Sequence, residues 1–198
     1  MKLILASGSP RRREILDALG IAFEVVVPEI EELADGVPEK VVVENARRKA
    51  AAGLRAAAQD AVALGVDTEV VLDGRLLGKA VGRAEARERL AALGGRTHTV
   101  LSGLALLGGG PMGGGAAERS GVAATQVTFR ELDRTTLETY LASGEWRDRA
   151  GAYAIQGLGS ILVERVDGDF SNVVGLPVRL LLELAPELLP RRASDLSK

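Results

Sequence analysis

Three arginines stand where a helix is predicted to begin, in the segment LASGSPRRREIL at residues 5–16. A helix N-terminus carries partial positive charge, so cations there are disfavoured unless an anion is bound. Helical spacing places Arg11 and Arg12 on the core-facing side, where two guanidiniums beside free backbone N–H groups form a site for an anion, most naturally phosphate. Arg13 falls on the exposed side, where it can pair with Asp17. The alternative is an ordinary solvated charge run, as three adjacent cations often are.

Acidic residues follow two of the predicted strands. Asp67 comes directly after the apolar run 61–66, and Glu32 belongs to an acidic loop after the predicted strand 21–28. Ligands of α/β sheets favour the carboxyl ends of strands, and Mg²⁺ takes one or two protein carboxylates together with substrate phosphates. With the arginines, these carboxylates suggest a metal–nucleotide site. The plainer alternative for Asp67 is that it caps a turn.

The scarcity of lysine makes two internal lysines informative. Only five of the 25 basic residues are lysines, so the chain uses arginine wherever a generic cation will serve. Lys49, on a long predicted helix, and Lys79, after a predicted hairpin, are therefore candidates for phosphate contacts, although most lysines serve surface solubility. The hydroxyl of Ser7 could add a donor near the arginines. The single histidine, His98, has the alternating pattern of a strand residue and is expected to be structural.

The overall composition excludes several classes of site. The chain has 198 residues, of which 46% are hydrophobic and 26% charged, with a net charge of -2 and no cysteine. Disulfides, thiolate nucleophiles, cysteine zinc sites and sites built on several histidines are therefore excluded. A negative net charge and 3% aromatic residues argue against nucleic-acid binding. The first apolar run is too short for a signal peptide or membrane span, so we expect a cytoplasmic protein without membrane contact.

The pattern of apolar and turn residues predicts helices between strands, with several hairpins. Predicted helices cover about 10–20, 38–58, 83–93, 133–142 and 177–189, and predicted strands cover 3–6, 21–28, 61–66, 97–107 and 120–130. Further hairpins are predicted with turns at Asp73-Gly74 and Asp167-Gly168. The glycine-rich segment 108–115 is expected to be a flexible hairpin tip without chemistry, and 191–198 a frayed tail. This order indicates an α/β fold with a mixed sheet.

Several separate motifs, in order along nearly the whole chain, carry a resemblance to a known family. They are LASGSPRR at 5–12, the acidic pair Glu31-Glu32, ARRKA around Lys49, GVDT at 65–68, LGK at 77–79, GRTH at 95–98, GAYAIQGLG at 151–159 and VVGLP at 173–177. Together they resemble the Maf family of nucleoside-triphosphate pyrophosphatases. The chain departs from the family pattern where GVDT replaces the usual GADT, and where Arg149 replaces a common lysine.

The resemblance implies a fold, an activity and a cofactor. The implied fold is the two-lobed inosine-triphosphatase-like (Maf/Ham1) fold, a mixed twisted sheet with flanking helices that forms a single domain over 1–198 with a central cleft. The implied reaction is cleavage of the α–β phosphoanhydride of a nucleoside triphosphate, giving the monophosphate and pyrophosphate, with Mg²⁺ or Mn²⁺ as the divalent metal. The family also suggests a homodimer.

The resemblance further assigns roles residue by residue. Asp67 resembles the proton acceptor that activates water, and Glu32 its acidic partner at the metal. The positions matching phosphate-binding residues are Ser7, Arg12, Lys49 and Lys79, and those matching residues of substrate choice are Arg11, Thr68 and Gln156.

The segment AIQG resembles the subgroup acting on dTTP and UTP, whereas the 7-methyl-GTP subgroup carries an acidic residue there. The amide of Gln156 offers a donor and an acceptor, which complement O4 and N3–H of uracil or thymine. The alternatives are 7-methyl-GTP hydrolysis, or a nucleotide-sensing regulator of septum formation without turnover. A pure sensor would have no need of a water-activating base at Asp67.

Overall fold

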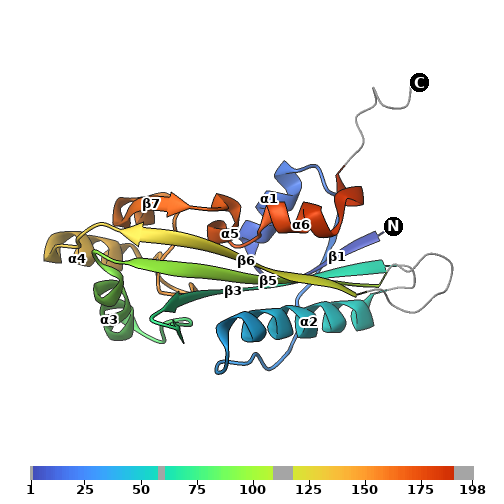
Figure 1. Ribbon diagram of the computed structural model, residues 1–198, viewed down its shortest axis with the longest axis horizontal. Helices are drawn as coiled ribbons and strands as arrows, with labels where there is room; N and C mark the ends of the chain where they lie inside the picture. Colours follow the sequence, from blue (N-terminus) through green and yellow to red (C-terminus); the bar gives the residue numbers. More distant parts are fainter. Residues whose placement is uncertain (1, 58–60, 109–117, 190–198) are drawn as a thin grey trace, which may run out of the picture.

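A single mixed sheet forms the centre of the computed structural model, which describes residues 2–57, 61–108 and 118–189 (Figure 1). Within these residues the sheet has seven strands in the order β2-β1-β3-β5-β6-β7, with β4 paired to β3. The strands are β1 (Lys2–Ala6), β2 (Glu24–Val26), β3 (Ala61–Leu72), β4 (Arg75–Leu76), β5 (Thr97–Gly108), β6 (Glu118–Phe129) and β7 (Val163–Asp167). β1 runs parallel to β2 and β3, and the other pairs are antiparallel. The predicted mixed α/β sheet with flanking helices is confirmed.

Helices cover both faces of this sheet. They are α1 (Pro10–Ala18), α2 (Pro38–Ala56), α3 (Arg83–Leu93), α4 (Arg134–Ser143), α5 (Phe170–Val174) and α6 (Val178–Leu184), with 3₁₀ turns η2 (Gly157–Leu162) and η3 (Pro186–Leu188). Figure 1 shows α2 against one face, and α1, α5 and α6 against the other. α3 and α4 lie together at one end of the long strands. No helix of the described segments is long and apolar enough to cross a membrane.

Two glycines allow α2 to pack unusually close to the sheet. A Cβ added to Gly65 of β3 would lie 2.0 Å from the carbonyl oxygen of Ala46, and one added to Gly103 of β5 would lie 2.1 Å from that of Val42. Both distances are far inside van der Waals contact, so any larger residue would push the helix away. The backbone of α2, which carries Lys49, is therefore fixed directly against β3.

The structure corrects the predicted length of the third strand. The apolar run ends at Val66, but β3 continues to Leu72, so Asp67 lies in the middle of a strand and not at its end. The reason is that β5 pairs with β3 continuously from Val62 to Val71. Burial under α2 ends halfway along β3, which is why the hydrophobic pattern stops before the strand does.

The predicted hairpin at Asp167-Gly168 is wrong in its second arm. β7 ends at Asp167, and the chain then forms α5 because the carboxylate of Asp169 caps a helix, accepting from the backbone N–H groups of Ser171 and Asn172. By contrast, the hairpin turn at Asp73-Gly74 is confirmed, with φ of 51° and 75° at its two central residues.

Smaller differences concern the ends of elements. The strand predicted at 21–28 covers only Glu24–Val26. The helix predicted at 177–189 ends at Leu184, and a 3₁₀ turn follows at Pro186–Leu188 because proline cannot continue the helix. The predicted glycine-rich tip lies outside the described residues from 109 onward, as does the predicted tail.

Candidate active site

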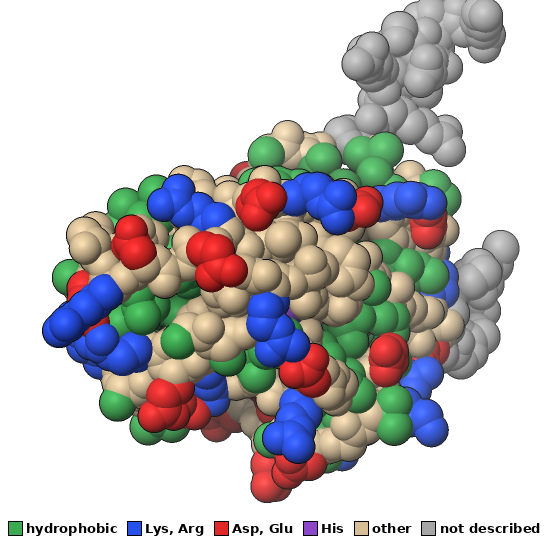
Figure 2. Space-filling view, turned by 60° about the vertical axis from the view of Figure 1, so that its left-hand side comes forward, with side chains coloured by type: hydrophobic (Ala, Val, Ile, Leu, Met, Phe, Trp, Pro, Cys, Tyr) green, Lys and Arg blue, Asp and Glu red, His purple; other side chains and the backbone are tan. Residues whose placement is uncertain are grey.

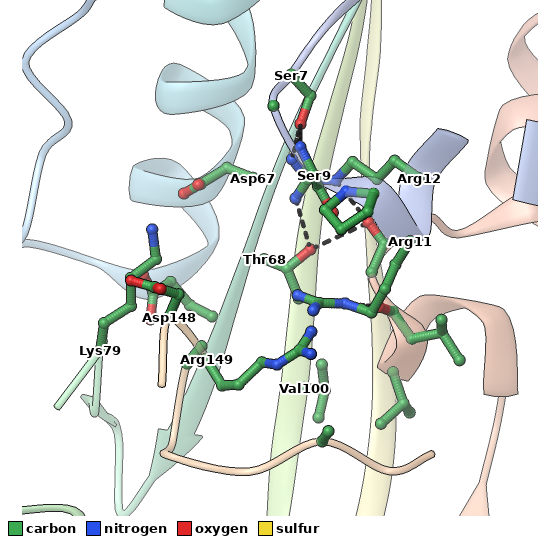
Figure 3. A pocket seen from close by; sticks show the side chains of 18 of the residues that line it. Ser7, Ser9, Arg11, Arg12, Asp67, Thr68, Lys79, Val100, Asp148 and Arg149 are labelled. Carbon is green, nitrogen blue, oxygen red and sulfur yellow. Dashed lines mark hydrogen bonds between the residues drawn. The ribbon is translucent and has the colours of Figure 1, made fainter. Parts of the chain in front are cut away.

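A cavity of about 610 Å³ opens where the end of β1, the first turn of α1 and the middle of β3 meet (Figure 3). The segments 147–150, 153–156 and 173–175 form further walls. Every residue that the sequence predicted for the site lines this cavity, namely Ser7, Arg11, Arg12, Glu32, Lys49, Asp67, Thr68, Lys79 and Gln156. The fold therefore brings together side chains that lie up to 149 positions apart between Ser7 and Gln156 in the sequence.

Asp67 is buried and held from two sides by residues of α2. The ammonium group of Lys49 lies 2.6 Å from Asp67 Oδ1, and the amide of Asn45 donates to Asp67 Oδ2 at 3.0 Å. Lys49 also lies 2.8 Å from Glu32 Oε1, so one buried cation joins the two predicted acidic residues. The carboxylate of Asp67 is thus fixed in a single orientation at the cavity wall.

Asn45 is a site residue that sequence reasoning missed. Its side chain is 1% exposed, donates to the carbonyl of Leu33 at 3.0 Å and accepts from the N–H of Leu33 at 2.8 Å. These two bonds attach the acidic loop that carries Glu32 to α2. A signal was present, because Asn45 precedes Lys49 by one helical turn and so shares its face.

Arg12 is buried, and each of its three guanidinium nitrogens donates one hydrogen bond to the protein. Its Nε donates to the carbonyl of Gly175 at 2.8 Å, its Nη1 to Ser7 Oγ at 2.9 Å and its Nη2 to Thr68 Oγ1 at 3.2 Å. Burial lowers the pKa of Arg12, while the charges of Asp67 and Glu32 act in the opposite direction. Arg12 therefore links α1, β3 and the 173–175 segment, in addition to placing positive charge at the cavity.

The other two arginines of α1 behave differently from each other. Arg11 lines the cavity, and its Nε donates to the carbonyl of Val174 at 3.0 Å. Arg13 is exposed, as predicted, but within the described residues it forms no ion pair with Asp17. The sorting of Arg11 and Arg12 to the cavity side by helical spacing is confirmed.

Glu69 is a second carboxylate at the cavity, on the face of β3 that carries Asp67. It follows Asp67 by two residues, so both side chains point to the same face of the strand. Its Oε2 is buried without a hydrogen-bond partner among the described residues. Burial first, and then the negative charge of Asp67, raise the pKa of Glu69 to about 7. Glu69 was not predicted for the site, although its spacing from Asp67 pointed to it.

Lys79 and Gln156 lie at the open side of the cavity, and both are exposed. Gln156 directly precedes η2, and the carboxylate of Glu145 holds that turn by accepting from the N–H groups of Leu158 and Gly159 at 3.1 Å each. The amide of Gln156 forms no hydrogen bond to the described residues, so it remains available to a ligand.

A buried aromatic cluster supports the wall next to Gln156. Tyr153 lines the cavity, and its hydroxyl lies 2.8 Å from Nε2 of His98. The His98 ring packs edge-on against Phe129 at 5.0 Å and against Tyr153 at 5.4 Å. Burial lowers the pKa of His98 to about 4, which keeps the ring neutral. The expected structural role of His98 agrees with these contacts.

The cavity offers carboxylate oxygens to a hard divalent cation, but not a complete set of protein ligands among the described residues. Glu32 contacts Lys49 through Oε1 only, and Glu69 Oε2 has no partner, so carboxylate oxygens remain for a ligand. No group of three or more acidic, histidine or cysteine side chains in the described segments is arranged to hold a metal. Mg²⁺ and Mn²⁺ do not need one where substrate phosphates complete the coordination shell.

Known proteins are similar in sequence to this chain over most of its length. The family described as Maf-like protein matches residues 2–188. A dTTP/UTP pyrophosphatase of Deinococcus radiodurans is 45% identical over 92% of this chain and 91% of the relative. Those of Gloeobacter violaceus and Vibrio cholerae are 45% and 44% identical, over 94% and 89% of this chain and 96% and 92% of theirs.

Likeness to solved structures is weaker. A nucleoside-triphosphatase / dITP/XTP pyrophosphatase from Mycobacterium abscessus matches with a TM-score of 0.41 and 22% identity, over 67% of this chain and 76% of that one. The assignment therefore rests on the sequence relatives and on the family match over residues 2–188: the chain belongs to the Maf family.

Proposed function

We propose that this protein hydrolyses dTTP and UTP to the monophosphate and pyrophosphate. The observation that carries the proposal is the arrangement of Lys49, Asn45 and Asp67, which fixes a carboxylate at the wall of a cavity that arginines and a lysine also line. Relatives 42–45% identical over most of the chain bear the name dTTP/UTP pyrophosphatase, which supports the choice of reaction and substrate.

In the proposed mechanism, the cationic wall binds the triphosphate and Asp67 acts on water. Asp67 takes a proton from a water molecule, whose oxygen forms a new bond to the α-phosphorus while the bond from that phosphorus to the bridging α–β oxygen breaks. Lys79 and Arg11 balance the negative charge that develops on the departing pyrophosphate. Arg12 adds its charge from behind Ser7 and Thr68, which it holds in place.

A divalent cation, Mg²⁺ or Mn²⁺, belongs to the proposal as well. Asp67 and Glu32 would hold it, and when bound it would shield the phosphate charges and polarise a phosphoryl oxygen. Lys49 lies between these two carboxylates, so it keeps them close together before any ligand binds.

Gln156 is the proposed determinant of the base. Its exposed amide offers both a donor and an acceptor to the O4 and N3–H edge of uracil or thymine.

On the face shown in Figure 2, acidic and basic side chains are interspersed and no single-sign patch dominates. This face therefore lacks the basic surface that nucleic-acid binding requires.

The test is to incubate the pure protein with Mg²⁺ or Mn²⁺ and a nucleotide panel, and to measure both pyrophosphate and monophosphate. We expect the highest kcat/KM for dTTP and UTP, and loss of turnover in Asp67→Asn with nucleotide binding retained. Faster turnover of 7-methyl-GTP would contradict the choice of base. Nucleotide binding without any turnover would favour the regulator of septum formation.

The proposed homodimer is tested separately by light scattering, and the proposed cytoplasmic location by cell fractionation.

A further inference from the structure

Arg149 projects into the cavity from the wall opposite α1. It lies in the segment 147–150, and Figure 3 shows its guanidinium pointing toward that of Arg11. Nη1 of Arg149 is buried and has no hydrogen-bond partner among the described residues. A buried guanidinium N–H without an acceptor is costly, so such a group is expected to serve a ligand.

The backbone around Arg149 is held in an unusual conformation by strong contacts. Asp148 and Ala152 have positive φ angles of 55° and 59°, which non-glycine residues rarely adopt. The N–H of Gly151 donates to the carbonyl of Gly78 at 2.8 Å, and a bridge pairs Lys79 with Ala150. Backbone strain that the surroundings maintain is typical of functional sites.

The same contacts fix the distance between Arg149 and the Lys79 segment. A Cβ added to Gly151 would lie 2.8 Å from Val70 of β3, so the turn can approach the sheet this closely only with glycine. Arg149 and Lys79 are thus presented to the cavity by two segments that are bonded to each other. A ligand that neutralises both cations would stabilise this turn.

Arg149 has no direct ion-pair partner among the described residues. In the described parts of the chain, neither Arg149 nor Arg11 forms an ion pair with a carboxylate. Burial lowers the pKa of Arg149, with no acidic neighbour acting against the shift. Two guanidiniums that face each other repel, and an anion placed between them removes the repulsion and gains paired, charge-assisted hydrogen bonds.

We propose that Arg149 and Arg11 together form a phosphate subsite, so that Arg149 binds the triphosphate directly. The inference rests on the proposed pyrophosphatase function and extends it to a residue outside the predicted site. Arg12 is less available to a phosphate, because its Nε, Nη1 and Nη2 each already donate one hydrogen bond to the protein. A neutral base carbonyl fits less well, because it leaves the two positive charges uncompensated.

The experiment measures binding of inorganic tripolyphosphate and of UTP by titration calorimetry without divalent metal. The variants are Arg149→Gln, Arg149→Lys and, as a matched control on the exposed side of α1, Arg13→Gln. We expect Arg149→Gln to weaken both ligands about tenfold or more, as for loss of a charged hydrogen bond. Arg149→Lys should restore part of the affinity, and Arg13→Gln should match the unaltered protein.

A double variant separates a shared subsite from a general change of charge. If Arg149 and Arg11 bind one phosphate, the loss in Arg11→Gln/Arg149→Gln will be smaller than the product of the two single losses. Additive losses would overturn the shared subsite. A thermal melt of each variant identifies any that do not fold, and Arg149→Met, which keeps the aliphatic stem, then takes the place of Arg149→Gln.

Two results would overturn the proposal outright. One is unchanged tripolyphosphate affinity in Arg149→Gln, even with weaker UTP binding, since that would place Arg149 against the base or ribose. The other is an absence of tripolyphosphate binding by the unaltered protein. Failure of the pyrophosphatase function has a different signature, because tripolyphosphate would still bind in an Arg149-dependent way while no nucleotide is turned over.

Discussion

The neutral, buried ring of His98 predicts a specific weakness of this protein toward acid. Its pKa falls from the usual 6.5 to about 4 because burial disfavours the charged form. The unfolded chain therefore binds a proton that the folded protein does not bind between these two pH values. Stability from this group is fully present above pH 6.5 and is lost as the pH falls toward 4.

The loss of unfolding free energy follows from the pKa of His98 in the unfolded and the folded state. At about 1.36 kcal/mol for each pH unit, protonation of His98 removes about 3 kcal/mol of unfolding free energy between pH 6.5 and pH 4. This is a large part of the roughly 5–15 kcal/mol that holds a typical domain folded. His98→Gln removes the titrating group while its amide can still reach the hydroxyl of Tyr153.

The assay is urea unfolding of both proteins at steps from pH 7 to pH 4. We expect His98→Gln to be less stable than the unaltered protein at pH 7, because it loses the edge-on ring contacts. The difference in unfolding free energy between the two proteins should narrow or reverse near pH 4. The chain contains a single histidine, so one NMR imidazole signal reports its pKa in the folded state. A folded-state pKa near 6.5, or parallel stability curves for the two proteins, would contradict the expected burial effect on His98.

Three further changes test other parts of the structure. Gly103→Ala should cost about 3 kcal/mol or more in urea unfolding, because its Cβ would meet the backbone of α2, whereas Gly82→Ala, with open space around it, should cost less than about 1. For Glu69→Gln, the difference in unfolding free energy from the unaltered protein should move in favour of the variant by about 1–3 kcal/mol from pH 5 to pH 8. The cause is the pKa of Glu69, raised to about 7, which makes the unaltered protein lose stability as the pH rises from 4.5 to 7. The same difference at pH 5 and at pH 8 would contradict this. Glu145→Gln should raise the KM for UTP several-fold with little change in melting temperature, because it weakens two hydrogen bonds to the turn after Gln156, and an unchanged KM would show that this turn does not position the base.

The site was more predictable from the sequence than the ends of the elements that form it. Helical spacing correctly placed Arg11 and Arg12 toward the cavity, because periodicity depends only on local geometry. The end of the apolar run, by contrast, misplaced Asp67 at a strand end. Hydrophobic patterns report burial, and β3 continues by pairing with β5 beyond the point where α2 covers it.

Residues that act through long-range contacts could not be predicted in the same way. Asn45 bonds to Asp67 and to Leu33, and Glu145 bonds to the turn after Gln156, but no local pattern distinguishes them from surface polar residues. The strand predicted after Gly168 is wrong for another reason. A capping aspartate outweighed the β-propensity of the valines that follow it.

The close contact of α2 with β3 and β5 has a consequence for how this enzyme could be adapted. Helix and sheet meet backbone to backbone at Gly65 and Gly103, so no side chain remains there that could be exchanged to adjust their spacing. The spacing between Lys49 and Asp67 is therefore set by backbone contacts. Adaptation toward new nucleotides would have to work on the facing wall near Gln156, whose exposed side chain can be exchanged without moving Asp67.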